Sequence, residues 1–277
     1  MITAAPPPNP AIVVGLGRLG SALARALEDE GGRIERLSGR AAADNPGLVA
    51  GALARCGTGA LLLLAVRDEE VGTLAERVAA ALPRPASGRA ALHLSGALGL
   101  DVLAPLARRG LPPGSCHPLQ TFPGSSSDAS RFRGAAFAVD GDGAALVEAE
   151  RLARTLGGRP FSISRERRAL YHLAASLSAN GLTALVGVAR DALVASGLDA
   201  QAALGALAPL LRAALEEALG RGPEDALTGP VARGDEATIA RHRRALLAWD
   251  ARRAALLEAL LREQRGLAAG RAPGPGC

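Results

Sequence analysis

The chain has 277 residues, of which 48% are hydrophobic but only 2% aromatic, enough for one large domain or two ordinary ones. All 32 basic residues are arginine, and the absence of lysine excludes every mechanism that needs a lysine as acid, base or Schiff-base nucleophile. The net charge of +5 does not indicate a nucleic-acid partner, because the arginines are interleaved with Asp and Glu and form no basic block.

The cysteines and the first residues indicate where the protein works. Cys56, Cys116 and Cys277 are odd in number and lack metal-type spacing, which favours reduced thiols and predicts no bound metal. The N-terminal residues lack the charged and apolar segments of a signal peptide, and the apolar run Ala60–Val66 is only strand-sized. We therefore predict a cytoplasmic protein with no membrane partner.

The first predicted element is a strand at Ala11–Val14, after a Pro-rich tail over residues 1–10 that we expect to be disordered. The strand leads into a glycine-rich turn and then into a helical pattern from about Ala22. A strand, a G-x-G-x-x-G turn and a helix in this order are typical of a dinucleotide site, where the helix N-terminus faces the pyrophosphate. The predicted cofactor contacts are Gly15, Leu16, Gly17, Arg18, Leu19 and Gly20. The alternative is a merely structural turn.

The end of the second predicted strand, Arg33–Leu37, indicates which dinucleotide binds. An NAD site usually places a carboxylate about 20 residues after the glycines to hold the ribose 2′-hydroxyl, whereas Ser38 and Arg40 stand here. Arginine can hold a 2′-phosphate with paired hydrogen bonds, so we predict NADP. Glu35 lies inside the strand, too early for the ribose role. The alternative is an arginine that is simply exposed on a turn.

The rest of the first half alternates strands and helices, which is typical of an α/β doubly wound sheet. The predicted strands are Ala60–Val66, Ala90–Leu94, Ala135–Val139 and Pro160–Ile163. The predicted helical segments run from a cap at Asp68 to about Leu82, through Leu100, Leu103 and Leu106, and over 144–156. We assign residues 11–164 to a Rossmann dinucleotide-binding domain.

Beyond residue 164 the strand patterns stop. Ala- and Leu-rich helical segments follow at Arg167–Ser196, Ala200–Gly220 and Asp235–Gln264. We assign residues 165–265 to an all-helical substrate and dimerisation domain, and 266–277 to a second disordered tail. Because the Ala/Leu-rich helices have too few large side chains to complete a core alone, a homodimer is expected.

Ligands of an open α/β sheet bind beyond the carboxyl ends of its strands. Val66 and Asp68 should border the nicotinamide ribose, and Ser95 should also contact the cofactor. His117, which precedes a proline, is a candidate proton donor or acceptor, because a histidine near its reference pKa of about 6.5 titrates at cellular pH. A structural hydrogen bond is the alternative for His117, and it is the preferred interpretation for His93.

His172, Ser176 and Asn180 recur every four residues and form one polar stripe on an otherwise apolar helix. Such a stripe on a core helix needs partners, and either a substrate or a neighbouring helix could supply them. We predict that His172 or His117 moves a proton, that Asn180 orients the substrate and that Ser176 contacts it.

The segment from Leu227 to Asp235 reads as an irregular link between helices. Thr228 and Arg233 are predicted substrate contacts, since the guanidinium of Arg233 could bind an anion. Asp235 is predicted to cap the next helix.

Several of these strings together resemble one family. They are the glycine loop, His-Leu-Ser-Gly-Ala, Cys-His-Pro-Leu-Gln-Thr-Phe, Tyr-His followed by Asn180, and Leu-Thr-Gly-Pro-x-x-Arg-Gly-Asp. The chain resembles, over residues 11–265, the Rossmann-like proteins with a C-terminal domain of unknown function 2520, which are usually labelled NADP oxidoreductases. It is more distantly similar to the superfamily of 6-phosphogluconate dehydrogenase, ketopantoate reductase and pyrroline-5-carboxylate reductase. The resemblance implies a Rossmann domain, a helical dimerisation domain and an active site between them, but no substrate.

One departure from that superfamily bears on mechanism. Its hydroxyacid-type dehydrogenases and ketopantoate reductases use a helix lysine four residues before an asparagine, and relative to Asn180 that position is Ser176. A histidine, His172 or His117, would then have to protonate the product. We expect an NADP(H)-dependent oxidoreductase acting on a small polar carbonyl or imine, of the ketopantoate reductase or pyrroline-carboxylate reductase kind. The alternative is a non-catalytic NADP-binding sensor or regulatory protein.

Overall fold

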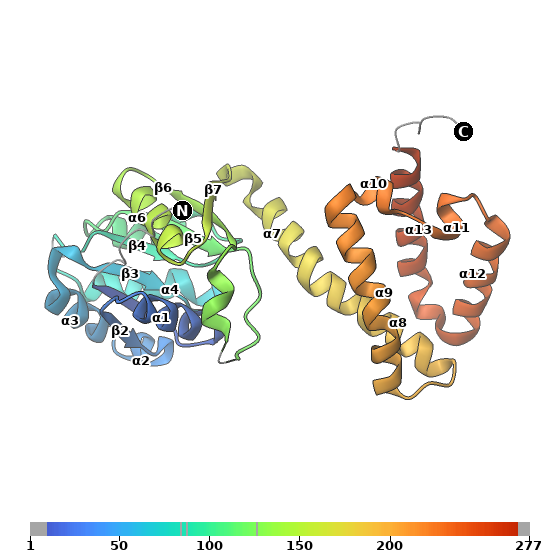
Figure 1. Ribbon diagram of the computed structural model, residues 1–277. Helices are drawn as coiled ribbons and strands as arrows, with labels where there is room; N and C mark the ends of the chain where they lie inside the picture. The colour runs from blue at the N-terminus through green and yellow to red at the C-terminus, as the bar shows by residue number, and fades with distance from the viewer. Residues whose placement is uncertain (1–9, 84, 87, 126, 271–277) are drawn as a thin grey trace. The chain divides into compact units, whose positions relative to one another are not determined.

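The computed structural model describes residues 10–83, 85–86, 88–125 and 127–270, so most of the predicted tail at 1–10 and residues 271–277 lie outside it. The chain divides into two compact units, Met1–Asn180 and Gly181–Cys277 (Figure 1). The boundary between the units falls later than the predicted boundary at residue 164. The reason is that Arg168 and Tyr171 of helix α7 (Arg168–Ser176) make hydrogen bonds to the sheet of the first unit.

The first unit is built on a seven-stranded sheet in the order β2-β1-β3-β4-β5-β6-β7. The strands are β1 (Ala11–Val14), β2 (Ile34–Leu37), β3 (Leu61–Leu64), β4 (Ala90–His93), β5 (Pro113–Pro118), β6 (Ala136–Gly141) and β7 (Arg159–Ser162). All neighbouring pairs are parallel except β5 and β6. This confirms the predicted α/β class with a sheet wound in both directions from β1.

Helices cover both faces of this sheet (Figure 1). They are α1 (Arg18–Asp29), α2 (Gly39–Asp44), α3 (Gly47–Cys56), α4 (Asp68–Ala81), α5 (Ala104–Ala107) and α6 (Ala144–Thr155). Short turns of helix lie at η1 (Gly57–Gly59), η2 (Leu100–Leu103), η3 (Asp128–Phe132) and η4 (Arg165–Arg167). The prediction that Asp68 caps α4 is wrong: Arg67 is the N-cap residue, and its backbone N–H donates to the Glu70 carboxylate at 3.3 Å.

Alternate residues of each central strand belong to two separate apolar clusters. Val13 and Leu63 pack with α1 and α6 on one face, while Val14 and Leu64 pack with α3 and α4 on the other. Because successive side chains of a strand point to opposite faces, a strand covered on both sides is apolar throughout. This is why the run of leucines in β3 allowed a strand to be predicted from the sequence.

The second unit is helical throughout its described residues, 181–270, as predicted. Its elements are α8 (Leu182–Ala195), α9 (Ala200–Arg221), α10 (Pro223–Ala226), α11 (Gly229–Ala232), α12 (Glu236–Asp250), η6 (Ala251–Arg253) and α13 (Ala254–Ala269), and the π-helical turn η5 (Leu177–Gly181) precedes them. The predicted continuous segment Asp235–Gln264 is in fact two helices, because Asp250 (φ −152°) leaves the helical region and its side chain caps a new turn at Arg252. The predicted tail from 266 is also wrong at its start, since α13 continues to Ala269.

Little of the second unit is buried. Its cluster of buried apolar residues consists of Val231, Ile239 and Leu261, with Leu257 packed against it. The helical segment Arg165–Ala195, which spans both units, is long and apolar enough to cross a membrane, and none of its apolar window is buried. The second part of this segment, α8, packs against α9, and its side chains are half-buried or exposed.

Candidate functional site

The three glycines of the loop after β1 differ in what surrounds them. Gly15 has a φ of +98°, and a Cβ there would lie 2.5 Å from the carbonyl oxygen of Ala65. A Cβ on Gly20 would lie 1.9 Å from the carbonyl oxygen of Gly15. A Cβ on Gly17 would meet nothing within 4 Å. The fold therefore requires Gly15 and Gly20, whereas the space at Gly17 is left for something other than protein.

That space lies at the N-terminus of a helix. Gly17 is the N-cap of α1 and no side chain caps the helix, so its first backbone N–H groups face outward. A free helix N-terminus with backbone accessible at a glycine suits the pyrophosphate of a dinucleotide. Leu16 and Arg18 are exposed there and, with Gly124 and Ser125, line a hollow of about 430 Å³. Leu19, in contrast, packs partly into the core.

A second hollow, of about 710 Å³, lies beyond the ends of β2 and β3. Its lining residues are Gly39, Arg40, Ala43, Val66, Arg67, Glu69, Glu70, Thr73, Leu74 and Arg77. Ser38 caps α2 by accepting a hydrogen bond from the Ala41 N–H, so a helix that the sequence did not reveal begins beside this hollow. Arg67 is held by Glu69 and Glu70 at 2.9 and 2.6 Å, while Arg40 is exposed on the rim.

The nearest earlier carboxylate points elsewhere. Glu35 pairs with Arg55 on α3, and its other oxygen lies 4.0 Å from the Cys56 sulfur. Glu35 is thus engaged within the first unit, on the side of β2 that faces α3. The end of β2 is followed by the Ser38 hydroxyl, the N-terminus of α2 and the exposed Arg40 guanidinium.

His93 and Ser95, at the end of β4, make hydrogen bonds to the backbone that follows the strand. His93 is fully buried, and its Nε2 lies 3.2 Å from the Gly99 carbonyl oxygen. Burial, and secondarily the positive charge of Arg168, lowers the pKa of His93 to about 3. The Ser95 hydroxyl accepts hydrogen bonds from the backbone N–H groups of Ala97 and Leu98, each at 3.1 Å. A cofactor contact by Ser95 would therefore have to use its hydroxyl hydrogen.

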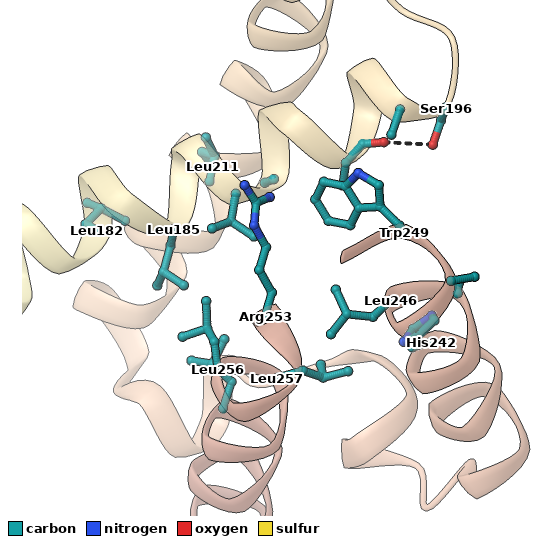
Figure 2. Close-up of a pocket in the computed structure, with 17 residues that line it drawn as sticks. Leu182, Leu185, Ser196, Leu211, His242, Leu246, Trp249, Arg253, Leu256 and Leu257 are labelled. Carbon is teal, nitrogen blue, oxygen red and sulfur yellow. Dashed lines mark hydrogen bonds between the residues drawn. The ribbon is translucent and has the colours of Figure 1, made fainter. Parts of the chain in front are cut away.

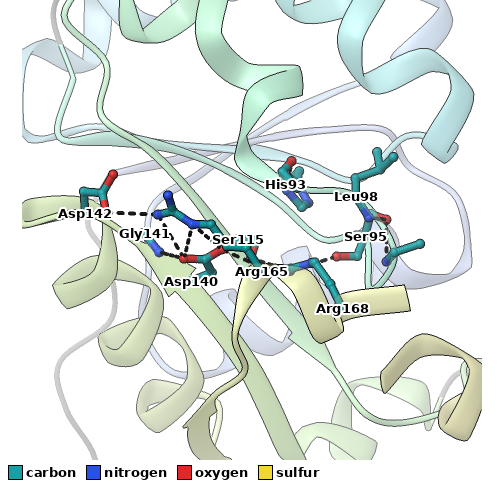
Figure 3. Close-up of polar contacts among 11 residues, drawn as sticks. His93, Ser95, Leu98, Ser115, Asp140, Gly141, Asp142, Arg165 and Arg168 are labelled. Carbon is teal, nitrogen blue, oxygen red and sulfur yellow. Dashed lines mark hydrogen bonds and ion pairs between the residues drawn. The ribbon is translucent and has the colours of Figure 1, made fainter. Parts of the chain in front are cut away.

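A buried arginine joins this region to α7 (Figure 3). Arg168 is only 4% exposed, and its Nη2 donates to the Ser115 hydroxyl at 2.5 Å and to the Ser95 carbonyl at 3.4 Å. Its Nη1 lies 3.5 Å from the carboxylate of Asp140, which also binds Arg165. The guanidinium thereby connects β4, β5 and β6, and burial lowers its pKa.

His117 is on β5 and lies near Arg168 of α7. Its Nδ1 is 2.6 Å from the Tyr171 hydroxyl, and its ring centroid is 6.2 Å from that of His172. Burial lowers the pKa of His117 to about 4, and the neighbouring His172 and Arg168 add to the effect. The expectation that His117 titrates near 6.5 is therefore wrong, because the sequence could not show how deeply this ring is buried. At neutral pH His117 is a neutral imidazole.

Gly96 brings the two imidazoles together. A Cβ on Gly96 would lie 2.9 Å from Nε2 of His117 and 2.9 Å from Cδ2 of His172. Glycine thus lets both rings approach the backbone at the carboxyl end of β4, where ligands of open α/β sheets bind. The two predicted proton-transfer residues are therefore side by side, and they come from elements far apart in the sequence.

The predicted polar stripe of His172, Ser176 and Asn180, on α7 and the turn after it, is less regular than predicted. His172 and Asn180 are exposed and Ser176 is half-buried, so this segment is not a core helix of the chain. The turn that contains Asn180 is π-helical, a wider turn that changes the direction of the side chains after Ser176. Such turns occur often at functional sites.

The remaining predicted contacts belong to the second unit. Thr228 is the N-cap residue of α11, and Arg233 follows the last residue of that helix. Asp235 caps α12 by accepting a hydrogen bond from the Thr238 N–H at 3.0 Å, as predicted. Thr228 and Arg233 stay predictions as substrate contacts.

Two residues of the site, Arg168 and Tyr171, were missing from the sequence-based candidates. Both stand in a segment that reads as the start of an apolar helix, and Tyr171 entered the sequence analysis only as part of the Tyr-His string, without a role of its own. The signal that could have found Arg168 is a charged residue one turn before the apolar stretch, on the face that also carries Tyr171.

Comparisons with known proteins agree with this geometry. The family model described as "Rossmann-like domain" matches residues 9–118. The model described as "Domain of unknown function (DUF2520)" matches residues 135–263. No curated protein gave a match.

Solved structures share the fold across nearly the whole chain. The "putative NADP oxidoreductase BF3122" from Bacteroides fragilis is 23% identical, with a TM-score of 0.70 over 93% of this chain and 98% of that chain. A reductive aminase from Aspergillus terreus, solved with NADPH and ethyl levulinate, is 21% identical, with a TM-score of 0.61 over 95% and 98%. Plasmodium falciparum pyrroline carboxylate reductase, solved with NADP bound, is 12% identical, with a TM-score of 0.59 over 94% and 99%. With its two matched domains in this order, the chain belongs to the Rossmann-like proteins that carry a C-terminal domain of unknown function 2520.

Proposed function

We propose that the protein is an NADP(H)-dependent oxidoreductase that acts on a small polar carbonyl or imine compound. The observation that carries the proposal is the open space at Gly17, between two glycines that the fold itself requires. A purely structural turn gives no reason for a bare backbone at a free helix N-terminus. Similar folds solved with NADPH or NADP bound support the same cofactor class.

The preference for NADP over NAD rests on the end of β2. Ser38, the start of α2 and the exposed Arg40 follow β2 directly, where a ribose 2′-substituent is expected in folds of this kind, and Glu35 is engaged elsewhere. A 2′-phosphate carries charge that Arg40 can bind with a forked pair of hydrogen bonds.

Arg40→Ala tests this preference. We expect NADPH to bind the unaltered protein at least about tenfold more tightly than NADH, because a charge-assisted hydrogen bond contributes roughly 1.5–3 kcal/mol. The substitution should remove most of that difference and leave NADH affinity nearly unchanged in titration calorimetry. Arg154→Ala, which removes an exposed arginine from α6, is the matched control for the lost charge. Equal affinities for the two cofactors in the unaltered protein would contradict the assignment.

The chain supplies polar groups for a reduction at the carboxyl edge of its sheet. When bound, the reduced nicotinamide would supply a hydride. His117 and His172 lie close enough together to serve the same substrate atom, and Ser176 and Asn180 follow on the next turns for substrate contact. Ser176 stands where related enzymes carry a lysine, so the proton must come from another group.

A non-catalytic NADP-binding sensor is the competing function. Oxidation of NADPH in the presence of a library of small carbonyl and imine compounds separates the two. Turnover of any such compound supports the oxidoreductase, and tight NADPH binding without turnover across the library supports the sensor.

We also propose that the protein works as a homodimer. A groove of about 880 Å³ in the second unit is lined almost entirely by apolar side chains, among them Leu185, Leu246, Trp249 and Leu256 (Figure 2). One wall of this groove is the second part of the apolar helical segment Arg165–Ala195, which contributes Leu182, Leu185 and Val188. A two-fold dimer in which the grooves of two copies meet would cover this apolar surface on both. A membrane is a poorer cover, because Arg168, Arg190 and Asp191 interrupt the segment.

Leu185→Glu tests the dimer. We expect the unaltered protein to show twice the mass of the chain in light scattering, and the variant to be a monomer, because a carboxylate would be buried in the interface without a partner. Val147→Glu, on the exposed face of α6 in the first unit, should remain dimeric. A monomeric mass for the unaltered protein at every concentration, with NADPH present, would rule the dimer out, and binding of that monomer to lipid vesicles would assign the helix to a membrane instead.

A further inference from the structure

Tyr171 and His117 form a fixed pair at the carboxyl edge of the sheet. The phenol Oη and the imidazole Nδ1 are 2.6 Å apart, and the rings meet edge to face with centroids separated by 5.6 Å. Phe161 of β7 also packs edge-on against Tyr171, at 6.0 Å between centroids. The hydrogen bond is therefore held between a strand and a helix of the same compact unit.

The protonation states give this hydrogen bond a direction. Burial raises the pKa of Tyr171 to about 12 and lowers that of His117 to about 4, so at neutral pH the phenol keeps its proton and the imidazole is neutral. Among the described residues the phenol has no other hydrogen-bond partner, so its hydrogen points to Nδ1. A neutral imidazole that accepts at Nδ1 carries its own hydrogen on Nε2.

The Nε2 atom of His117 faces the backbone after β4. Gly96 leaves the space beside Nε2 free of a side chain, and the His172 ring borders the same point. The N–H that could protonate a ligand thus lies at the sheet edge where the substrate of such a fold is expected.

We propose that Tyr171 is the proton source of the reduction and that His117 passes the proton on by exchanging its tautomer. This inference rests on the proposed oxidoreductase function. Hydride addition to a carbonyl carbon moves the π electron pair to oxygen and leaves an alkoxide. The new O–H bond forms as the Nε2–H bond of His117 breaks, and the Nδ1–H bond forms as the Oη–H bond of Tyr171 breaks. The imidazole stays neutral throughout, and water then reprotonates the phenolate.

The groups around Tyr171 favour this transfer. The guanidinium of Arg168, on the same helix, stabilises a phenolate. Cys116, on the facing strand, is kept neutral because burial raises the pKa of its thiol, and Phe161 is apolar. Two other titratable rings lie near His117: His172, and His93, whose burial keeps it neutral. Because an alkoxide is far more basic than a phenolate, the proton moves downhill without an imidazolium or a lysine.

The first test does not depend on activity. Tyr171 is the only tyrosine, so near-ultraviolet titration of the full-length protein reports its pKa without overlap, and it should lie near 12. Nitrogen-15 NMR of the histidine rings, assigned with His117→Gln, should show Nε2 of His117 protonated and Nδ1 bare at pH 7. A protonated Nδ1, or an imidazolium at His117, would overturn the relay.

The second test is kinetic, with NADPH and a substrate found in the library. Tyr171→Phe keeps the ring but removes the proton, so the single-turnover rate should fall about 100-fold or more while the NADPH dissociation constant stays the same. In mixtures of light and heavy water, the rate of the unaltered protein should curve as expected for two protons in motion, and that of Tyr171→Phe should lose the curvature. Ser178→Ala, which removes an exposed hydroxyl bonded only to its own helix, is the matched control.

The possible outcomes separate the relay from the proposed function. Full activity in Tyr171→Phe with a large loss in His172→Gln would overturn the relay and assign the proton to His172, while leaving the oxidoreductase function in place. A double variant, Tyr171→Phe with His117→Gln, that is no slower than the slower single variant would support one shared relay. Failure of the unaltered protein to bind NADPH would overturn the proposed function and the relay with it.

Discussion

Gly17→Ala is expected to fold normally and to lose most of its affinity for NADPH. A methyl group at this position meets no protein atom within 4 Å, so we expect the free energy of unfolding to change by no more than about 1 kcal/mol, the usual range for an N-cap substitution. The same methyl would occupy the space through which a pyrophosphate reaches the first N–H groups of α1. Loss of one or two charge-assisted hydrogen bonds would weaken binding roughly 10- to 100-fold or more.

Gly20→Ala is the companion variant. A Cβ at Gly20 would lie 1.9 Å from the Gly15 carbonyl oxygen, so α1 cannot keep its position against the loop. We expect this variant to lose both stability and binding, which urea denaturation and NADPH titration measure in parallel. NADPH affinity that is unchanged in Gly17→Ala would show that the cofactor does not approach α1 at this glycine.

Arg168→Met is expected to cost the first unit about 3 kcal/mol of unfolding free energy. The guanidinium is 4% exposed, and its removal leaves the fully buried Ser115 hydroxyl without the donor at 2.5 Å and takes one cation from Asp140. Removing one member of a buried polar group typically costs about 3–5 kcal/mol, and the second cation on Asp140, Arg165, places our value at the lower end.

Two further variants make this prediction specific. Arg165→Met removes the half-exposed arginine from the same carboxylate and should cost less than about 1 kcal/mol, because water already screens that pair. Arg168→Met combined with Ser115→Ala should regain part of the loss, since it removes donor and acceptor together. Denaturation followed by amide hydrogen exchange in the sheet measures all three. Equal losses for Arg165→Met and Arg168→Met would mean that burial of Arg168 contributes nothing.

The sequence predicted those features that depend on residues close together in the chain. The run of leucines in β3, the glycine spacing after β1 and the helical periodicity beyond residue 164 each report a local backbone preference or a periodic burial pattern. Strand β5 was not predicted, because its prolines, glycine and polar residues lack the β-branched pattern of a buried strand. Pairing with β4 and β6 makes it a strand, and that pairing is not encoded in the segment itself.

The candidate site shows the same division. The glycine loop, Ser38 and Arg40 could be proposed as cofactor contacts from the sequence alone, because a phosphate-binding turn consists of consecutive residues. The chemistry at the other end of the sheet depended on the tertiary structure. Arg168 acquires its partners, and His117 its neutral ring and its tyrosine, only when α7 packs against β4, β5 and β6. Burial and electrostatic neighbours come from residues distant in the chain, so only the folded structure decided that the ring of His117 is buried and which groups lie beside it.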